Sequence, residues 1–233
     1  MNKNLVRITA FVAGVITAFV ALFYAISGIL DLTRFSGNAS AKYNIYVALS
    51  AVLAIAVAAA LGIISYFVIK EFIKNEESKK HWFLCATATF FTYIVVGTLI
   101  TMILSSSWDS AMNWVRLIFS VAGCVLAVVA LMGKVNNNNS KILATISVVI
   151  GFLVAVLGLV NAGGFGIAVG IFLLFMFISY FVYYVFEMVL DGSFKTNTNN
   201  AEAKEEAKVE VKEEVKEETS KADSNEKEEK ENN

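Results

Sequence analysis

Six apolar runs occupy most of the first 190 residues and limit what this chain can fold into. They cover residues 5–30, 45–69, 82–104, 111–132, 142–160 and 166–189. A helix needs about 20 mainly apolar residues to cross the hydrocarbon core of a bilayer, and every run is close to or above that length. Short polar connections separate the runs. The sequence therefore predicts an all-α fold, a polytopic membrane helix bundle of six transmembrane helices arranged as three hairpins in residues 1–191.

The first run has an alternative interpretation as a cleaved signal peptide. Ala25 and Ser27 have the small side chains of a cleavage site. The apolar part from Ile8 to Ile26 is, however, longer than the roughly 7 to 15 residues of a signal-peptide core. This length favours an uncleaved membrane anchor.

The connection from Lys70 to His81, KEFIKNEESKKH, is the most densely charged segment before the C-terminal tail. Lysine and arginine in short loops gather on the cytoplasmic side of membrane proteins, whereas acidic residues have little influence. The predicted bundle carries most of its basic residues on one side. That side has Lys3, Arg7, Lys70, Lys74, Lys79, Lys80, Lys134, Lys141 and Lys195, and the other has Arg34, Lys42 and Arg116. We therefore expect a multi-pass protein of the cell membrane with both termini in the cytoplasm.

Small residues recur at four-residue spacing inside several of the predicted spans. In lipid, close helix packing depends on small residues that let two backbones approach each other. The residues that we expect to pack in this way are Gly14, Ala54, Ala58, Gly62, Gly151, Gly166 and Gly170. A ligand groove along one of these rows is the alternative. The GxxxG spacing of Gly166 and Gly170 would also suit a homo-oligomer.

The third span is the richest in hydroxyl groups. Thr89, Tyr93, Thr101 and Ser105 lie on one stripe at multiples of four residues. Such a stripe would suit a polar path for a small solute. The alternative is that each hydroxyl bonds the carbonyl four residues earlier in its own helix, which requires neither water nor solute.

Charged residues avoid the middle of every predicted span. Arg7, Arg116, Glu187 and Asp191 all fall near span ends, where long side chains reach the interface. Proton-coupled pumps normally need a charged group deeper in the membrane, and the chain has no proline to break a helix for a binding site. A proton-driven transporter is therefore not expected.

Motifs for enzymatic chemistry are also missing from the sequence. The chain has one histidine and two cysteines, and it contains no HExxH, CxxC, GxSxG, P-loop or dinucleotide motif. We therefore expect no enzyme activity, no metal and no cofactor. Nucleic acid is not an expected partner, because the basic residues are scattered among the connections. Cys85 and Cys124 would differ in depth by about 9 Å, beyond the roughly 7 Å between Cα atoms that a disulfide allows, so both should be free thiols.

A five-residue sequence occurs twice in the apolar part of the chain. Ile64 to Val68, ISYFV, recurs as Ile178 to Val182 in the sixth span. The first and third hairpins could therefore be duplicated units with the same orientation. Chance is the alternative, because short matches arise easily among apolar residues.

The C-terminal tail, residues 192–233, has low complexity and a high density of charge. It contains eight lysines and thirteen acidic residues. In residues 201–218 lysine recurs every fourth position, which suits a marginal single helix with Glu–Lys pairs. The composition of the remainder is typical of disorder. The tail is either a solvated segment or, through residues 201–218, a docking element for a cytoplasmic protein.

Two functions remain open from the sequence. The first is a non-enzymatic membrane protein, in contact with membrane lipid, that acts as a scaffold or accessory subunit through its tail or through the connection from Lys70 to His81. The second is the membrane component of a transporter for a small neutral or apolar solute, with its site beside the third span.

Overall fold

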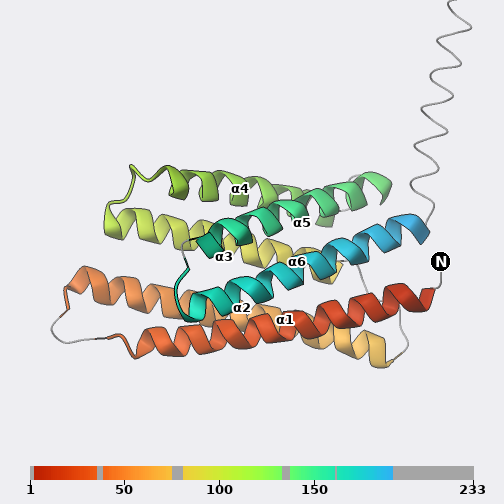
Figure 1. Ribbon diagram of the computed structural model, residues 1–233, viewed down its shortest axis with the longest axis horizontal. Helices are drawn as coiled ribbons and strands as arrows, with labels where there is room; N and C mark the ends of the chain where they lie inside the picture. Colours follow the sequence, from red (N-terminus) through yellow and green to blue (C-terminus); the bar gives the residue numbers. More distant parts are fainter. Residues whose placement is uncertain (1–2, 36–38, 75–80, 133–136, 161, 191–233) are drawn as a thin grey trace, which may run out of the picture. The chain divides into compact units, whose positions relative to one another are not determined.

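The computed structural model describes residues 3–35, 39–74, 81–132, 137–160 and 162–190, and all the regular secondary structure in these ranges is α-helical (Figure 1). The six helices are α1 (Lys3–Leu32), α2 (Ala41–Ile73), α3 (His81–Ser105), α4 (Ala111–Leu131), α5 (Asn137–Val160) and α6 (Phe165–Leu190). All six are long and apolar enough to cross a membrane. The prediction of an all-α fold with six membrane-length helices is therefore confirmed for the described part of the chain. The predictions for the tail, residues 192–233, and for its segment 201–218 fall on residues that are not described.

Several helices extend beyond the apolar runs from which they were predicted. Helix α2 has 33 residues, which at about 1.5 Å per residue is near 50 Å, against a hydrocarbon core of about 30 Å. Its last turns continue through Lys70 and Glu71, which are good helix formers. Its first turn is capped by Ser40, whose Oγ accepts a hydrogen bond from the backbone N–H of Tyr43 at 3.3 Å.

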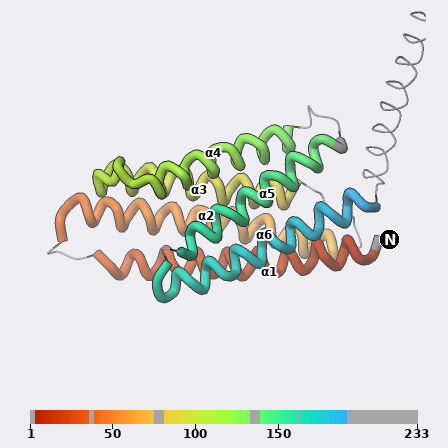
Figure 2. Tube along the Cα trace, turned by 45° about the horizontal axis from the view of Figure 1, so that its top comes forward, coloured from red at the N-terminus to blue at the C-terminus, as the bar shows by residue number. Residues whose placement is uncertain are grey.

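The helices are arranged in a closed circuit (Figures 1 and 2). Each packs against the next in sequence, and α6 returns to pack against α1. The contact between α1 and α2 is the most extensive, whereas α4 packs on α5 about as closely as α5 packs on α6. The contacts therefore do not separate residues 3–190 into three independent hairpins.

Aromatic rings fill the centre of the bundle. Phe83 and Phe90 of α3 and Phe177 and Tyr180 of α6 are almost completely buried. The ring centroids of Phe83 and Tyr180 lie 4.8 Å apart, and those of Phe90 and Phe177 lie 4.9 Å apart. These distances are typical of favourable aromatic pairs. Long side chains thus connect α3 to α6 across the middle of the circuit.

Glycines provide room for side chains at several helix contacts. A Cβ at Gly151 would overlap the ring of Phe177, and a Cβ at Gly14 would lie 2.8 Å from Cγ1 of Val68. Gly170 is packed in the same way against Leu159.

The other predicted packing residues differ in how closely they approach a neighbouring side chain. Ala54 and Ala58 are buried in α2. A Cβ at Gly166 would make only an ordinary contact with Ala162, and a Cβ at Gly62 would meet nothing within 4 Å. Gly123 was not among the predictions, although a Cβ there would overlap the ring of Phe91.

Charged side chains near the helix ends do not all reach the interface, which corrects an expectation from the sequence. Glu187 is buried, with its Oε1 3.9 Å from Nζ of the buried Lys141. Glu71 is also buried and accepts a 2.8 Å hydrogen bond from Nε1 of Trp82. A charge is retained inside a protein when it is paired or hydrogen-bonded, and these contacts supply that condition. At this end of the bundle, where α1 begins, buried charged side chains thus join neighbouring helices.

Two arginines bond the last turns of neighbouring helices. Nη2 of Arg116, in α4, donates to the carbonyl of Leu157 in α5 at 2.8 Å. Nη2 of Arg7, in α1, donates to the carbonyl of Phe72 in α2 at 3.3 Å. The last four carbonyls of a helix have no partner within that helix. Both arginines thus satisfy carbonyls at the C-terminus of an adjacent helix instead of reaching only toward the interface.

Candidate solute pocket

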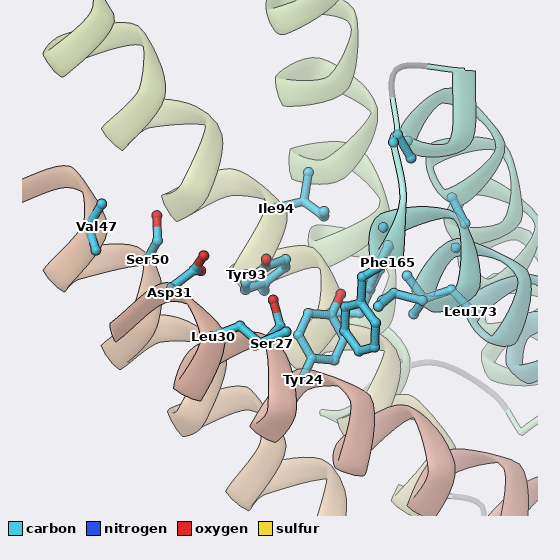
Figure 3. A pocket seen from close by; sticks show the side chains of 18 of the residues that line it. Tyr24, Ser27, Leu30, Asp31, Val47, Ser50, Tyr93, Ile94, Phe165 and Leu173 are labelled. Carbon is cyan, nitrogen blue, oxygen red and sulfur yellow. The ribbon is translucent and has the colours of Figure 1, made fainter. Parts of the chain in front are cut away.

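A pocket lies at the end of the bundle opposite the start of α1 (Figure 3). Its volume is about 530 Å³, within the range of roughly 300 to 1,000 Å³ that is usual for ligand sites. Helices α1, α2, α3, α5 and α6 all contribute to its wall. The polar and aromatic residues of the wall are Tyr24, Ser27, Asp31, Arg34, Tyr43, Tyr46, Ser50, Phe90, Tyr93 and Phe165.

Helical spacing brings the polar residues of α1 and α2 to the pocket. Tyr24, Ser27 and Asp31 are three and four residues apart, so they share one face of α1. Tyr43, Tyr46 and Ser50 have the same spacing on α2. In Figure 3, Ser27 and Asp31 extend from α1 toward Tyr93 of α3. Two helices with a short connection thus line one side of the pocket with hydroxyl and carboxylate groups.

Small residues of α5, of α6 and of the connection between them form another part of the pocket wall. They are Ala155, Gly158, Ala162, Gly163, Gly166 and Gly170. The turn between the two helices includes Gly164 at a φ of +52°, a left-handed conformation that glycine adopts without steric cost. At Gly158 and Gly163 a Cβ would meet nothing within 4 Å. The pocket exists because these positions lack side chains that would fill the space facing the tyrosines.

Two tyrosine rings meet at the inner part of the pocket. The centroids of Tyr24 and Tyr93 are 4.9 Å apart, with an interplanar angle of 74°. Tyr24 is buried and Tyr93 is half-buried. The two rings therefore form a corner of aromatic surface, one ring from α1 and the other from α3.

The charged groups of the pocket are an aspartate and an arginine. Nη1 of Arg34 lies 3.0 Å from Oδ1 of Asp31. The Asp31 side chain is 19% exposed and the Arg34 side chain is 64% exposed, so the arginine is at the rim and the carboxylate is further inside. An exposed ion pair of this kind contributes about 0 to 1 kcal/mol. The pair leaves the carboxylate directed at the pocket without a strong competitor.

Of the four residues of the predicted path along the third span, Tyr93 lines this pocket and the other three do not. Thr89 and Thr101 donate hydrogen bonds to the carbonyls of Cys85 and Gly97, four residues earlier in α3, at 2.8 and 2.9 Å. Ser105 is exposed at the last residue of α3. For the two threonines, the geometry is that of hydroxyls bonded to their own helix.

Several residues of the pocket were not singled out by the sequence argument. Asp31 was placed in a loop, whereas α1 continues to Leu32. Tyr43 and Tyr46, at the start of α2, also line the pocket. The signal that could have found them is a pair of polar stripes at helical spacing, one at the end of α1 and one at the start of α2.

The repeated sequence ISYFV makes different contacts in its two copies. Oγ of Ser65 donates to the carbonyl of Gly14 in the neighbouring α1 at 2.8 Å. Oγ of Ser179, its equivalent, donates to the carbonyl of Met176 in its own helix at 2.7 Å. The matched serines thus give no support for a duplicated hairpin.

The described ranges were also considered for a metal site. These ranges contain no group of three or more histidine, cysteine, aspartate or glutamate residues placed to hold a metal ion. Cys85 and Cys124 are both free thiols. Comparisons of the chain with protein-family models, with curated proteins and with solved structures find no match.

Proposed function

We propose that this chain is an integral membrane protein that binds a small solute in the pocket between α1, α2, α3, α5 and α6, as the membrane component of a transport system. The observation that carries the proposal is the pocket itself, with a volume of about 530 Å³ and convergent hydroxyl, carboxylate and aromatic groups. A concave site with a few convergent polar groups is the usual form of a small-molecule site. The scaffold hypothesis depends on residues 201–218 or on the connection from Lys70 to His81, and residues 75–80 of that connection and the whole of 201–218 lie outside the described ranges.

The distribution of basic residues supports an orientation for the site. Arg34 and Lys42 lie at the pocket end, whereas Lys70, Lys74 and Lys141 lie at the other. By the positive-inside rule the second end faces the cytoplasm. In this proposal the protein resides in the cell membrane and the pocket opens to the outside.

Two glycines allow a matched test of the pocket. A Cβ would meet nothing within 4 Å at either Gly158 or Gly62, but Gly158 lines the pocket and Gly62 does not. Gly158→Leu should place a side chain in the pocket with little strain, and Gly62→Leu is the control. Both changes also remove a glycine from a helix interior, which is favourable by about 1 kcal/mol or less.

The measurement is a thermal-shift screen of the purified protein in nanodiscs against neutral, cationic and anionic small solutes. We expect at least one class to raise the Tm of the wild type and of Gly62→Leu by several degrees, because a ligand at about 100 times its Kd stabilises by roughly 2.7 kcal/mol. The same solutes should leave the Tm of Gly158→Leu unchanged. Equal shifts in Gly158→Leu and Gly62→Leu, or no shift with any solute, would contradict the proposal.

A further inference from the structure

The pocket combines one carboxylate with an aromatic wall, and both of these groups attract a cation. Asp31 is the acidic residue among the described residues that line it. Tyr24, Tyr43, Tyr46 and Tyr93 contribute four aromatic rings. An aromatic face attracts a cation through its quadrupole, and quaternary ammonium groups are recognised in this way.

The geometry of the inner rings suits a rounded cation. Tyr24 and Tyr93 stand nearly perpendicular, at 74°, with centroids 4.9 Å apart. Asp31 is seven residues beyond Tyr24 on the same face of α1. Figure 3 shows its carboxylate and the ring of Tyr93 beside the same space. A positive group placed there would contact aromatic surface from two helices and approach the carboxylate.

The existing partner of Asp31 leaves room for a second cation. Arg34 contacts Oδ1 through Nη1 at 3.0 Å. Its side chain is 64% exposed, against 19% for Asp31, so the guanidinium is largely in solvent. Arg34 and Asp31 both line the pocket, and the contact of Arg34 is with one of the two carboxylate oxygens.

We infer that the pocket binds an organic ammonium ion, with its positive group between Asp31 and the rings of Tyr24 and Tyr93. This inference rests on the proposed function and specifies its solute class. It replaces the neutral or apolar solute expected from the sequence, because that expectation was made from the third span alone and did not include Asp31.

The test compares choline with 3,3-dimethylbutan-1-ol, an uncharged molecule of nearly the same shape. Kd is measured by calorimetry on the full chain in nanodiscs of phosphatidylglycerol, which contain no ammonium lipid. We expect choline to bind about 10-fold more tightly than its isostere, the order of magnitude of a desolvated cation–π contact.

Substitutions at Asp31 and Arg34 measure how much each charge contributes to the affinity for choline. Asp31→Asn should weaken choline binding about 10-fold and leave the isostere unchanged. Arg34→Gln should strengthen choline binding a few-fold, because it removes a competing cation. Asp109→Asn is the matched control, since Asp109 is exposed and does not line the pocket, and it should leave both affinities within 2-fold. If Asp31→Asn lowers the yield of folded protein, Tyr93→Leu tests the aromatic wall and should weaken choline more than the isostere.

The outcomes distinguish this inference from the proposed function. Equal affinity for choline and its isostere, unaffected by Asp31→Asn, would overturn the ammonium inference and leave a solute pocket. Absence of choline binding, with another solute class sensitive to Gly158→Leu, would do the same. No binding of any solute would overturn both.

A final comparison identifies the source of the ammonium group. The choline titration is repeated in nanodiscs that contain phosphatidylcholine. A weaker apparent affinity would support the inference with a lipid headgroup as the competing ligand. An unchanged affinity would support it with a soluble ammonium ion.

Discussion

At Gly151 and Gly123, a hydrogen atom occupies the position where any other residue would place a carbon against an aromatic ring. The rings are those of Phe177 and Phe91, both completely buried. Because a packed interior has few voids, neither ring has space to move away from an added methyl group. Single atoms at these positions therefore decide whether α5 can lie against α6 and α4 against α3.

Gly151→Ala should lower the stability of the bundle. The added Cβ would overlap the ring of Phe177, and overpacking of a core typically costs about 1 to 3 kcal/mol. Gly62→Ala is the control, with open space for its Cβ and an expected gain of about 1 kcal/mol or less. Thermal unfolding in detergent measures both. A Tm for Gly151→Ala equal to or above the wild-type value would show that α5 and α6 do not meet as described.

The residues of close contact were only partly predictable from the sequence. Four-residue spacing singled out Gly14, Gly151 and Gly170, which lie against side chains of other residues. The same spacing singled out Gly62, where a Cβ would have open space, and omitted Gly123. Spacing within one helix defines a face, but it does not tell which face meets a neighbour or what side chain the neighbour brings.

The helices of this bundle are joined by a small number of hydroxyl contacts. Thr17 of α1 and Tyr180 of α6 have their oxygens 2.6 Å apart, and both side chains are buried. Ser147 of α5 donates to the carbonyl of Gly123 in α4 at 2.9 Å. In lipid, polar contacts of this kind help to hold helices together because no hydrophobic force acts between them. The Thr17–Tyr180 contact joins the first and last helices of the circuit.

A double-mutant cycle tests this contact between α1 and α6. Thr17→Val and Tyr180→Phe each remove one hydroxyl with little change of shape. We expect a coupling energy of about 0.6 kcal/mol, and up to about 1.7 kcal/mol, as found for hydrogen bonds between membrane helices. The same cycle with Thr101→Val in place of Thr17→Val is the control, because both threonines bond a carbonyl of their own helix but Thr17 is the one in contact with Tyr180. Additive effects in the Thr17 cycle would mean that the two hydroxyls do not interact.

The number of helices was predictable, whereas their facing surfaces were not. Six long apolar runs are sufficient to predict six helices, because each run satisfies the length needed to cross a bilayer. A helix that is apolar all round gives no amphipathic pattern from which to read its inner face. For this reason the hydroxyls of Thr89 and Thr101 were considered for a solute path, although they bond carbonyls within α3.

The two ends of the bundle differ in character. At one end, Lys141 pairs with Glu187 and Trp82 donates a hydrogen bond to Glu71. At the other end, small residues such as Gly158 line a pocket of about 530 Å³.

The pocket could not be predicted from the sequence and became apparent only in the three-dimensional structure. The pocket combines residues from five helices, and no single helix carries enough of its wall to indicate it. Tyr93 was predicted as part of a solute path because it belongs to the hydroxyl-rich span. Asp31 and Tyr24 come from α1, which packs on α2 and α6, and the contact of Tyr24 with Tyr93 of α3 reaches across the bundle.

Thiol modification tests whether the pocket opens to the outside of the cell, as we propose. Ser27 lines the pocket, and Ser27→Cys is introduced into a chain in which Cys85 and Cys124 are replaced by alanine. Ser147→Cys, at a completely buried position between α4 and α5, is the control.

Intact cells are treated with a positively charged, membrane-impermeant methanethiosulfonate. We expect modification of Ser27→Cys, slower modification when Gly158→Leu is added, and none of Ser147→Cys. Modification of Ser27→Cys only after the membrane is permeabilised would contradict the outward orientation, and no modification even then would contradict an accessible pocket.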